Sequence, residues 1–213
     1  MVRHDVSVLL CVLFFGLGAP GLAEEPAGAK YRGMLEKLKS GDLSVDLNEL
    51  RLAYADSSDY SPPGDPDTQK AVFSALSKKK YSEAIKIAQK GLGEDYFDIE
   101  LHHALYIAYR ETNEPAKSQF HNAVASGFIR SIMQSGDGKT PATAYRVLST
   151  HEEYVILKVL GLVPEKQSLL EKDGHQYDLQ KARNAETGEE HEFYFNIDKP
   201  YGYLRGLLEP DGK

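Results

Sequence analysis

The spacing of hydrophobic and polar positions changes once along the chain, near Ser135. Before that residue, apolar side chains recur every three or four positions, which is typical of amphipathic helices. After it, short alternating segments are separated by glycine-containing turns, which is typical of strands. The pattern predicts an α+β protein in which antiparallel helical hairpins (24–134) pack against a region with a small antiparallel β-meander (135–213), as one compact unit.

Two short helices are expected first, over Tyr31–Leu38 and Asp46–Ala55. Asp46 is a good N-cap, and Glu49, three residues later, is the matching residue of a capping box. Pro62, Pro63 and Gly64 then predict a loop, because this combination does not continue a helix.

Two helical hairpins are expected after this loop, and they resemble tetratricopeptide repeats. Asp65 and Pro66 are typical of a helix start. Tyr81 and Pro115 begin similar segments about 34 residues apart, which is the period of that repeat. The match is partial, since Ser118 and Asn122 stand where the repeat has alanines. The predicted helices begin near Asp65 and Ser82 and then cover Ile99–Tyr109 and Ala116–Met133.

The region after Ser135 is expected to mix strands with one central helix. Thr150 to Glu153 reads as a capping box, and Gly161 can end the helix that it opens. This helix is apolar on nearly all sides, so it should be buried between two layers. The strands expected around it are Ala144–Ser149, Gln167–Glu171, His175–Lys181 and His191–Ile197, with a closing helix over Tyr201–Leu208.

Residues 1–23 have the pattern of a secretory signal. Arg3 and His4 precede an apolar run from Val6 to Leu17, and Ala23 ends a small-residue cleavage site. The alternative is an uncleaved membrane anchor, but a span needs about 20 apolar residues and this run is shorter. We therefore expect a secreted or periplasmic mature protein. The only cysteine, Cys11, would leave with the signal, which excludes a disulfide or a cysteine-ligated metal.

Charge and hydropathy limit the classes of partner. The formal net charge is −7, which disfavours non-specific nucleic-acid binding because that depends on lysine and arginine at phosphates. No apolar run after the signal approaches membrane length, so no membrane association is expected once the signal is removed. We expect no cofactor.

The segment Gly138-Lys139-Thr140 is the one phosphate-loop lookalike. A true P-loop needs a glycine five residues earlier, where Met133 stands, and a helix after it, where Pro141 follows. The segment is therefore better interpreted as a turn, with Gly136 as a left-handed helix cap. Asp137 hints at a cation loop, but the acidic partners of an EF-hand are missing.

Histidines are the next candidates for chemistry. His102 and His103 are adjacent on a helix and point about 100° apart, so both cannot face one ion, although either could meet His121. No local pair has metal-ligand spacing, and a metal site is not expected. His175 shares a strand face with Tyr177, and it could approach His191 across the strand pair, where cross-strand packing is the simpler explanation.

The chain has 13 tyrosines and no tryptophan. Repeat-like hairpins often bind partners on a concave face, where tyrosine offers contact area and a hydroxyl. Core packing is the commoner role for such residues. The candidates in the helical part are Tyr54, Tyr60, Tyr81, Tyr96, Tyr106 and Tyr109.

Several separated segments together resemble a known family, the domain of unknown function 4919, which is found chiefly in bacteria. The resemblance runs from about Asp42 to Leu207 and implies a shared fold. It supplies no activity, cofactor or site residue. The segments that carry it are Leu50–Tyr54, Ser135–Tyr145, Thr150–Leu162, Gln167–Leu169, Asp173–Tyr177 and Tyr194–Asp198.

The sequence therefore predicts a non-catalytic binding or scaffold module with a protein or peptide partner. The alternatives are an uncharacterised enzyme, with its site in a groove between the helical and sheet regions, and a purely structural protein. A deep pocket of converging polar groups would favour the enzyme, and an open tyrosine-lined concavity would favour binding. The candidate ligand-binding residues beside the joint are Asp137, Lys139, Thr140, His175 and Tyr177.

Overall fold

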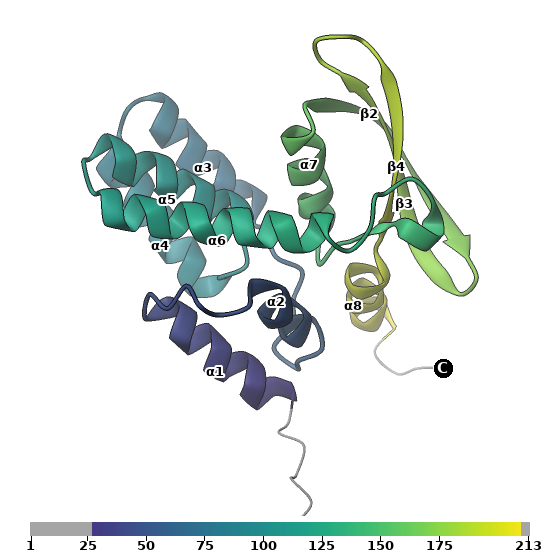
Figure 1. Ribbon diagram of the computed structural model, residues 1–213, viewed down its shortest axis with the longest axis horizontal. Helices are drawn as coiled ribbons and strands as arrows, with labels where there is room; N and C mark the ends of the chain where they lie inside the picture. Colours follow the sequence, from purple (N-terminus) through teal and green to yellow (C-terminus); the bar gives the residue numbers. More distant parts are fainter. Residues whose placement is uncertain (1–26, 210–213) are drawn as a thin grey trace, which may run out of the picture.

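A computed structural model describes residues 27–209 (Figure 1). The expected signal segment 1–23 and Cys11 lie outside these residues. Six helices come first, and a small sheet with two further α-helices follows, so the α+β prediction is confirmed. The helices before the sheet are α1 (Ala27–Lys39), α2 (Leu47–Ala55), α3 (Pro66–Ser77), α4 (Tyr81–Glu94), α5 (Ile99–Glu111) and α6 (Pro115–Met133).

The elements after α6 are shorter and more varied. A single turn of 3-10 helix, η1, precedes the first strand. In the described chain the order is η1 (Pro141–Thr143), β1 (Tyr145–Arg146), α7 (Thr150–Val159), β2 (Leu162–Lys172), β3 (His175–Asn184), β4 (Glu190–Asn196) and α8 (Asp198–Leu208).

Local capping signals explain where the early helices begin. The Asp46 carboxylate accepts hydrogen bonds from the backbone N–H groups of Asn48 (2.9 Å) and Glu49 (3.0 Å). Asp65 caps α3 in the same way, with Pro66 at its first position. The predicted N-cap at Asp46 is therefore confirmed. The Glu49 side chain, which was expected to complete the capping box, forms an ion pair with Lys30 of α1 (2.5 Å).

One buried cluster joins the helices to the sheet. The Tyr54 and Phe97 rings stack at 4.0 Å, and Phe97 stacks in turn on Phe128 at 5.4 Å. The same cluster continues to Ile156 of α7 and Phe195 of β4, both fully buried. The two parts therefore share this hydrophobic core.

The sheet has the order β1-β4-β3-β2. Strands β2, β3 and β4 form the predicted antiparallel meander, and Asp173 and Gly174 make the first turn with positive φ angles of 53° and 80°. The expected strand over 144–149 is limited to Tyr145 and Arg146, which pair in parallel with β4. It ends there because the Leu148 backbone N–H turns to the Glu152 carboxylate (2.6 Å).

The predicted capping box of α7 is wrong. Ser149 is the N-cap, Thr150 is already the first helical residue, and Ser149 makes no side-chain capping bond. Glu152 and Glu153 point into the protein, where they are 4% and 0% exposed. The two glutamates bond to Arg51 and Gln180 in the core, and this arrangement replaces the local capping box.

Helix α7 lies between the sheet and the helical part, as predicted, but its burial is incomplete. Tyr154 and Val159 are 44% and 50% exposed, because the helix lies along one side of the sheet, against β2, α5 and α6 (Figure 1). Gly161 ends the helix with a φ of 72°, as predicted. Within residues 27–209, no helix combines the length and apolarity needed to cross a membrane.

The Gly138-Lys139-Thr140 segment is a turn, as expected, although the left-handed glycine differs. Gly138 has a φ of 69°, whereas Gly136 is outside the positive-φ region, so its prediction as a left-handed cap is wrong. Gly136 is constrained by close approach instead, since a Cβ there would lie 2.1 Å from the Thr143 carbonyl oxygen. Gly138 donates to that same oxygen (2.8 Å) and accepts from the Tyr194 N–H (2.7 Å).

Candidate functional site

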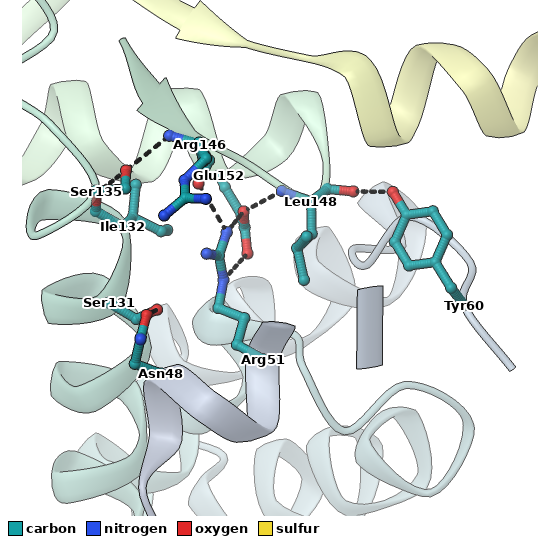
Figure 2. Close-up of polar contacts among 9 residues, drawn as sticks. All are labelled: Asn48, Arg51, Tyr60, Ser131, Ile132, Ser135, Arg146, Leu148 and Glu152. Carbon is teal, nitrogen blue, oxygen red and sulfur yellow. Dashed lines mark hydrogen bonds and ion pairs between the residues drawn. The ribbon is translucent and has the colours of Figure 1, made fainter. Parts of the chain in front are cut away.

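A buried ion pair fixes the start of α7 against the helical part (Figure 2). The Arg51 Nε donates to the Glu152 carboxylate at 3.3 Å, and its Nη2 contacts both that carboxylate and the Arg146 carbonyl oxygen (3.2 Å). The same carboxylate accepts from the Leu148 N–H. One carboxylate thus links α2, the end of β1 and the first turn of α7.

Two further contacts in Figure 2 complete this joint. The Tyr60 hydroxyl donates to the Leu148 carbonyl oxygen at 2.7 Å, which ties the loop after α2 to the same segment. The Ser135 hydroxyl accepts from the Arg146 N–H (2.7 Å) at the end of α6. The backbone that leads into α7 is therefore bonded on both sides.

Hydrogen bonds to Tyr54 and Asp95 hold the proline-containing loop before α3 in place. The Tyr54 hydroxyl donates to the Ser61 carbonyl oxygen (2.8 Å) and accepts from its N–H (3.0 Å). The Gly64 N–H donates to the Asp95 carboxylate (2.7 Å), and burial raises the pKa of Asp95 to about 6. Gly64 has a φ of +108°, and a Cβ there would lie 3.1 Å from the His151 side chain, so the loop lies close against α7.

An open groove of about 540 Å³ lies between this loop, the start of α7 and α8. Its walls are mostly apolar, and Tyr203, which lines it, meets the Tyr60 ring edge to face at 5.8 Å. The residues that form the apolar walls are Pro62, Pro63, Pro66, Ile197, Pro200, Tyr201, Tyr203, Leu204 and Leu207.

Helix α8 presents an apolar surface that no other described element covers. Leu204, Leu207 and Leu208 are 54%, 63% and 73% exposed, and two tyrosines beside them are more than a third exposed. Single exposed leucines are ordinary, but a group of large apolar side chains on one helix marks an interaction surface. This helix forms one wall of the groove.

The start of α7 contributes polar groups to the groove. Ser149 is 4% exposed, and its hydroxyl has no hydrogen-bond partner within residues 27–209. In the same part of the chain, the N–H groups of Thr150 and His151 have no acceptor, as expected for the first turn of a helix without a side-chain cap. All three residues line the groove.

The His151 side chain is held in place by a relay of polar groups. Its Nε2 contacts the Gln69 side-chain oxygen, and the Gln69 amide donates to Asp98 (2.8 Å). Asp98 also caps α5 by accepting from the Leu101 N–H (3.0 Å). Helices α3, α5 and α7 therefore meet at one side of the groove.

A second buried polar group lies between α7 and β3. The Gln180 amide donates to Glu153 (2.7 Å), and burial, with Asp178 nearby, raises the pKa of Glu153 to about 9. Asp178 accepts from the Gln167 amide (2.6 Å). Glu153 is therefore neutral at pH 7, and it shares this buried region with a second carboxyl group.

The residues that the sequence singled out as ligand-binding separate into two places. His175 and Tyr177 line an open pocket of about 460 Å³. Asp137, Lys139 and Thr140 are absent from its lining. The Asp137 carboxylate accepts from the Lys139 N–H (3.0 Å), and Thr140 caps η1. The structure brings the first two together and leaves the other three on the turn, and ligand binding by any of them stays a prediction.

His175 and His191 do not approach each other across the strand pair, which was the alternative that the sequence left open beside cross-strand packing. His191 pairs with Ala182 in the β3–β4 register, seven positions along β3 from His175. His175 instead contacts Asp198 through its Nδ1 (2.7 Å). The two histidines lie at opposite ends of the β3–β4 strand pair, because the register of the pair places His191 opposite Ala182.

The contact between His102 and His121 is confirmed, with their Nδ1 atoms 2.9 Å apart. Nε2 of His102 bonds to the Tyr96 carbonyl oxygen (3.0 Å), which can only accept. Burial lowers the pKa values of His102 and His121 to about 3 and about 4. Within the described chain, no three potential ligands from His, Cys, Asp or Glu gather into a metal site.

The tyrosines of the helical part mainly serve packing. Tyr54 and Tyr109 are buried, and Tyr60 and Tyr96 are half-buried against the core. The residues that form the open groove were missed as a site, although Pro62 and Pro63 were recognised as a loop and 201–208 as a helix. Two signals were available: the proline pair, and the apolar spacing within a terminal helix.

Comparison with known proteins identifies a family but no function. No curated protein and no solved structure matches this chain. A family match covers residues 23–205, which is most of the chain and agrees with the resemblance of its separated segments. The chain belongs to the family described as Domain of unknown function (DUF4919).

Proposed function

We propose that this protein is a non-catalytic binding module that holds an apolar segment of a partner protein in the groove between the 61–66 loop and α8. The observation that carries the proposal is the exposed apolar face of α8 beside Pro62 and Pro63. Surfaces of this kind on a single chain are often functional.

The chemistry of the walls suits a peptide. Proline and tyrosine are stiff side chains, so they lose little conformational entropy when they are covered. The groove is open along one side, which admits a segment of a larger molecule, whereas small-molecule sites usually enclose most of their ligand. An open, tyrosine-lined concavity such as this groove is the feature expected of a binding protein.

The proposal includes export. Residues 1–23 have the pattern of a secretory signal, so the partner is expected in the periplasm or outside the cell. The negative formal charge favours a protein partner over a nucleic acid.

The test is selection of peptides from a random display library against the wild-type protein. Selected peptides are expected to carry apolar side chains and to bind with micromolar affinity. Leu204→Asp should weaken their binding about tenfold or more, because it places a charge in the apolar wall. Leu204 is 54% exposed, so this variant should fold.

Leu169→Asp is the matched control, because Leu169 is 60% exposed on β2 and outside the groove. It should bind the selected peptides as the wild type does. Equal loss of binding in both leucine variants, or no enrichment of any peptide, would refute the proposed groove.

A further inference from the structure

We infer that the start of α7 binds a carboxylate, so that the groove takes the C-terminal end of an apolar peptide chain. This inference rests on the proposed binding function and specifies its ligand. It assigns Ser149, Thr150 and His151 to the carboxylate, and Tyr203, Leu204 and Leu207 to the last apolar side chains.

The first argument is the set of donors without partners. The N–H groups of Thr150 and His151 have no acceptor within residues 27–209, and both residues line the groove. A helix N-terminus with free N–H groups attracts anions, since the helix dipole places partial positive charge there.

The second argument is independent of the helix end. The Ser149 hydroxyl is buried and has no partner in the described chain, although an unsatisfied buried hydroxyl is costly. Ser149 could cap the helix in the usual way but does not. A carboxylate oxygen at this end of the groove would accept from this hydroxyl and from the two N–H groups together.

The nearby acidic residues do not cancel this attraction. The charge of Glu152 is paired with Arg51, and burial of Glu153 raises its pKa to about 9, so its carboxyl group is neutral at pH 7. Asp98 is engaged with Gln69 and with the start of α5. Asp65 accepts hydrogen bonds from the start of α3, and Glu100, 3.9 Å from the His151 Nε2, is also paired with Lys158 at 4.0 Å.

The groove combines the polar and apolar parts that a chain terminus requires. Thr150, the proposed donor to the carboxylate, lines the same groove as the leucines and tyrosines of α8. A lone small anion would leave these side chains uncovered. An apolar segment without a free carboxylate would leave the three donors unused.

The test compares two forms of one peptide library. N-terminally labelled hexapeptides vary at their last three positions over Ala, Val, Leu, Phe and Tyr, and each is made with a free carboxylate and as a C-terminal amide. We expect the best free acids to bind about tenfold more tightly than their own amides, because hydrogen bonds to a charged group are lost in the amide.

Thr150→Pro and Thr150→Ala form a matched pair of variants. Proline is tolerated at the first position of a helix, and Ser149 already has the extended backbone (φ −153°, ψ 159°) that precedes proline. Thr150→Pro removes one donor and should bring the free acid close to the amide in affinity. Thr150→Ala keeps the N–H and should preserve the difference.

An NMR measurement on the wild-type protein tests carboxylate binding at the start of α7 without any variant. The backbone amide signals of Thr150 and His151 should move with the free acid and stay in place with the amide. Equal binding of both forms, lost in Leu204→Asp, would overturn the carboxylate inference and keep the proposed function. If neither the free acids nor the amides bind the wild-type protein more tightly than they bind Leu204→Asp, both the carboxylate inference and the proposed function are overturned.

Discussion

Arg51 and Glu152, 101 residues apart in the chain, form a buried ion pair that joins α2 to the first turn of α7. Arg51→Met would leave the Glu152 carboxylate buried with only the Leu148 N–H as a donor. We expect this change to lower the free energy of unfolding by about 3 to 5 kcal/mol, measured by urea denaturation.

The exposed pair of Arg205 and Glu209 at the end of α8 provides the control, because its side chains are 69% and 60% exposed. Arg205→Met should leave stability nearly unchanged. A double variant, Arg51→Met with Glu152→Gln, should be more stable than Arg51→Met alone. Equal effects of the buried and the exposed arginine changes would contradict the role assigned to this joint.

Glu153 makes stability fall as pH rises. Burial raises its pKa to about 9 in the folded protein, above the ordinary value of 4.5, so the folded state holds a proton that the unfolded state has lost. This stabilisation is complete below about pH 4.5 and is lost on the way to pH 9, with a slope of about 1.4 kcal/mol per pH unit from this group.

Glu153→Gln should remove that slope, since the amide has no proton to lose and can still accept from Gln180. Urea denaturation at several values between pH 5 and 9 measures the difference. Glu171→Gln, at an exposed position of β2, is the control and should follow the wild type. A wild-type slope that survives in Glu153→Gln would assign the effect to another group.

The His102–His121 pair has the opposite pH dependence. Both pKa values are lowered by burial, to about 3 and about 4, so the folded protein excludes protons that the unfolded chain binds below about pH 6.5. Stability contributed by this pair should therefore fall as pH drops from 6.5 towards 4. NMR should find both rings neutral at pH 6, with the His102 proton on Nε2, and titration of His102 near pH 6.5 would refute the pairing.

Substitutions at Gly138 and Lys139 distinguish a structural turn from a phosphate-binding loop. A Cβ at Gly138 would lie 2.6 Å from the Tyr145 ring, and its φ of +69° is unfavourable for other residues. We expect Gly138→Ala to cost about 2 kcal/mol or more in thermal or urea unfolding. Lys139→Ala should leave stability unchanged and should not alter nucleotide binding, which we expect to be undetectable in both proteins.

Local chemistry explains which elements the sequence could predict. Asp46 and Asp65 cap their helices with atoms only two or three residues away, and Asp173 with Gly174 sets the first hairpin turn through its own backbone angles. Such signals do not depend on distant residues. The helical part and the meander were predictable for this reason.

The errors have a common physical cause in long-range partners. Thr150 to Glu153 satisfies the local rule for a capping box, but Arg51 and Gln180 draw the two glutamates into the core. The strand expected over 144–149 stops at Arg146, because Leu148 bonds to one of those glutamates. Local pattern cannot rank a capping bond against a buried ion pair formed across the molecule.

The candidate site shows the same division. The sequence by itself determined the proline loop at 62–64 and a helix over 201–208, since both depend on backbone preferences of neighbouring residues. Only the tertiary structure brought them into one groove with Ser149 and left the hydroxyl of that serine without a partner within residues 27–209. A groove is a relation between surfaces distant in sequence, so packing of the whole chain decides where it forms and which donors remain free.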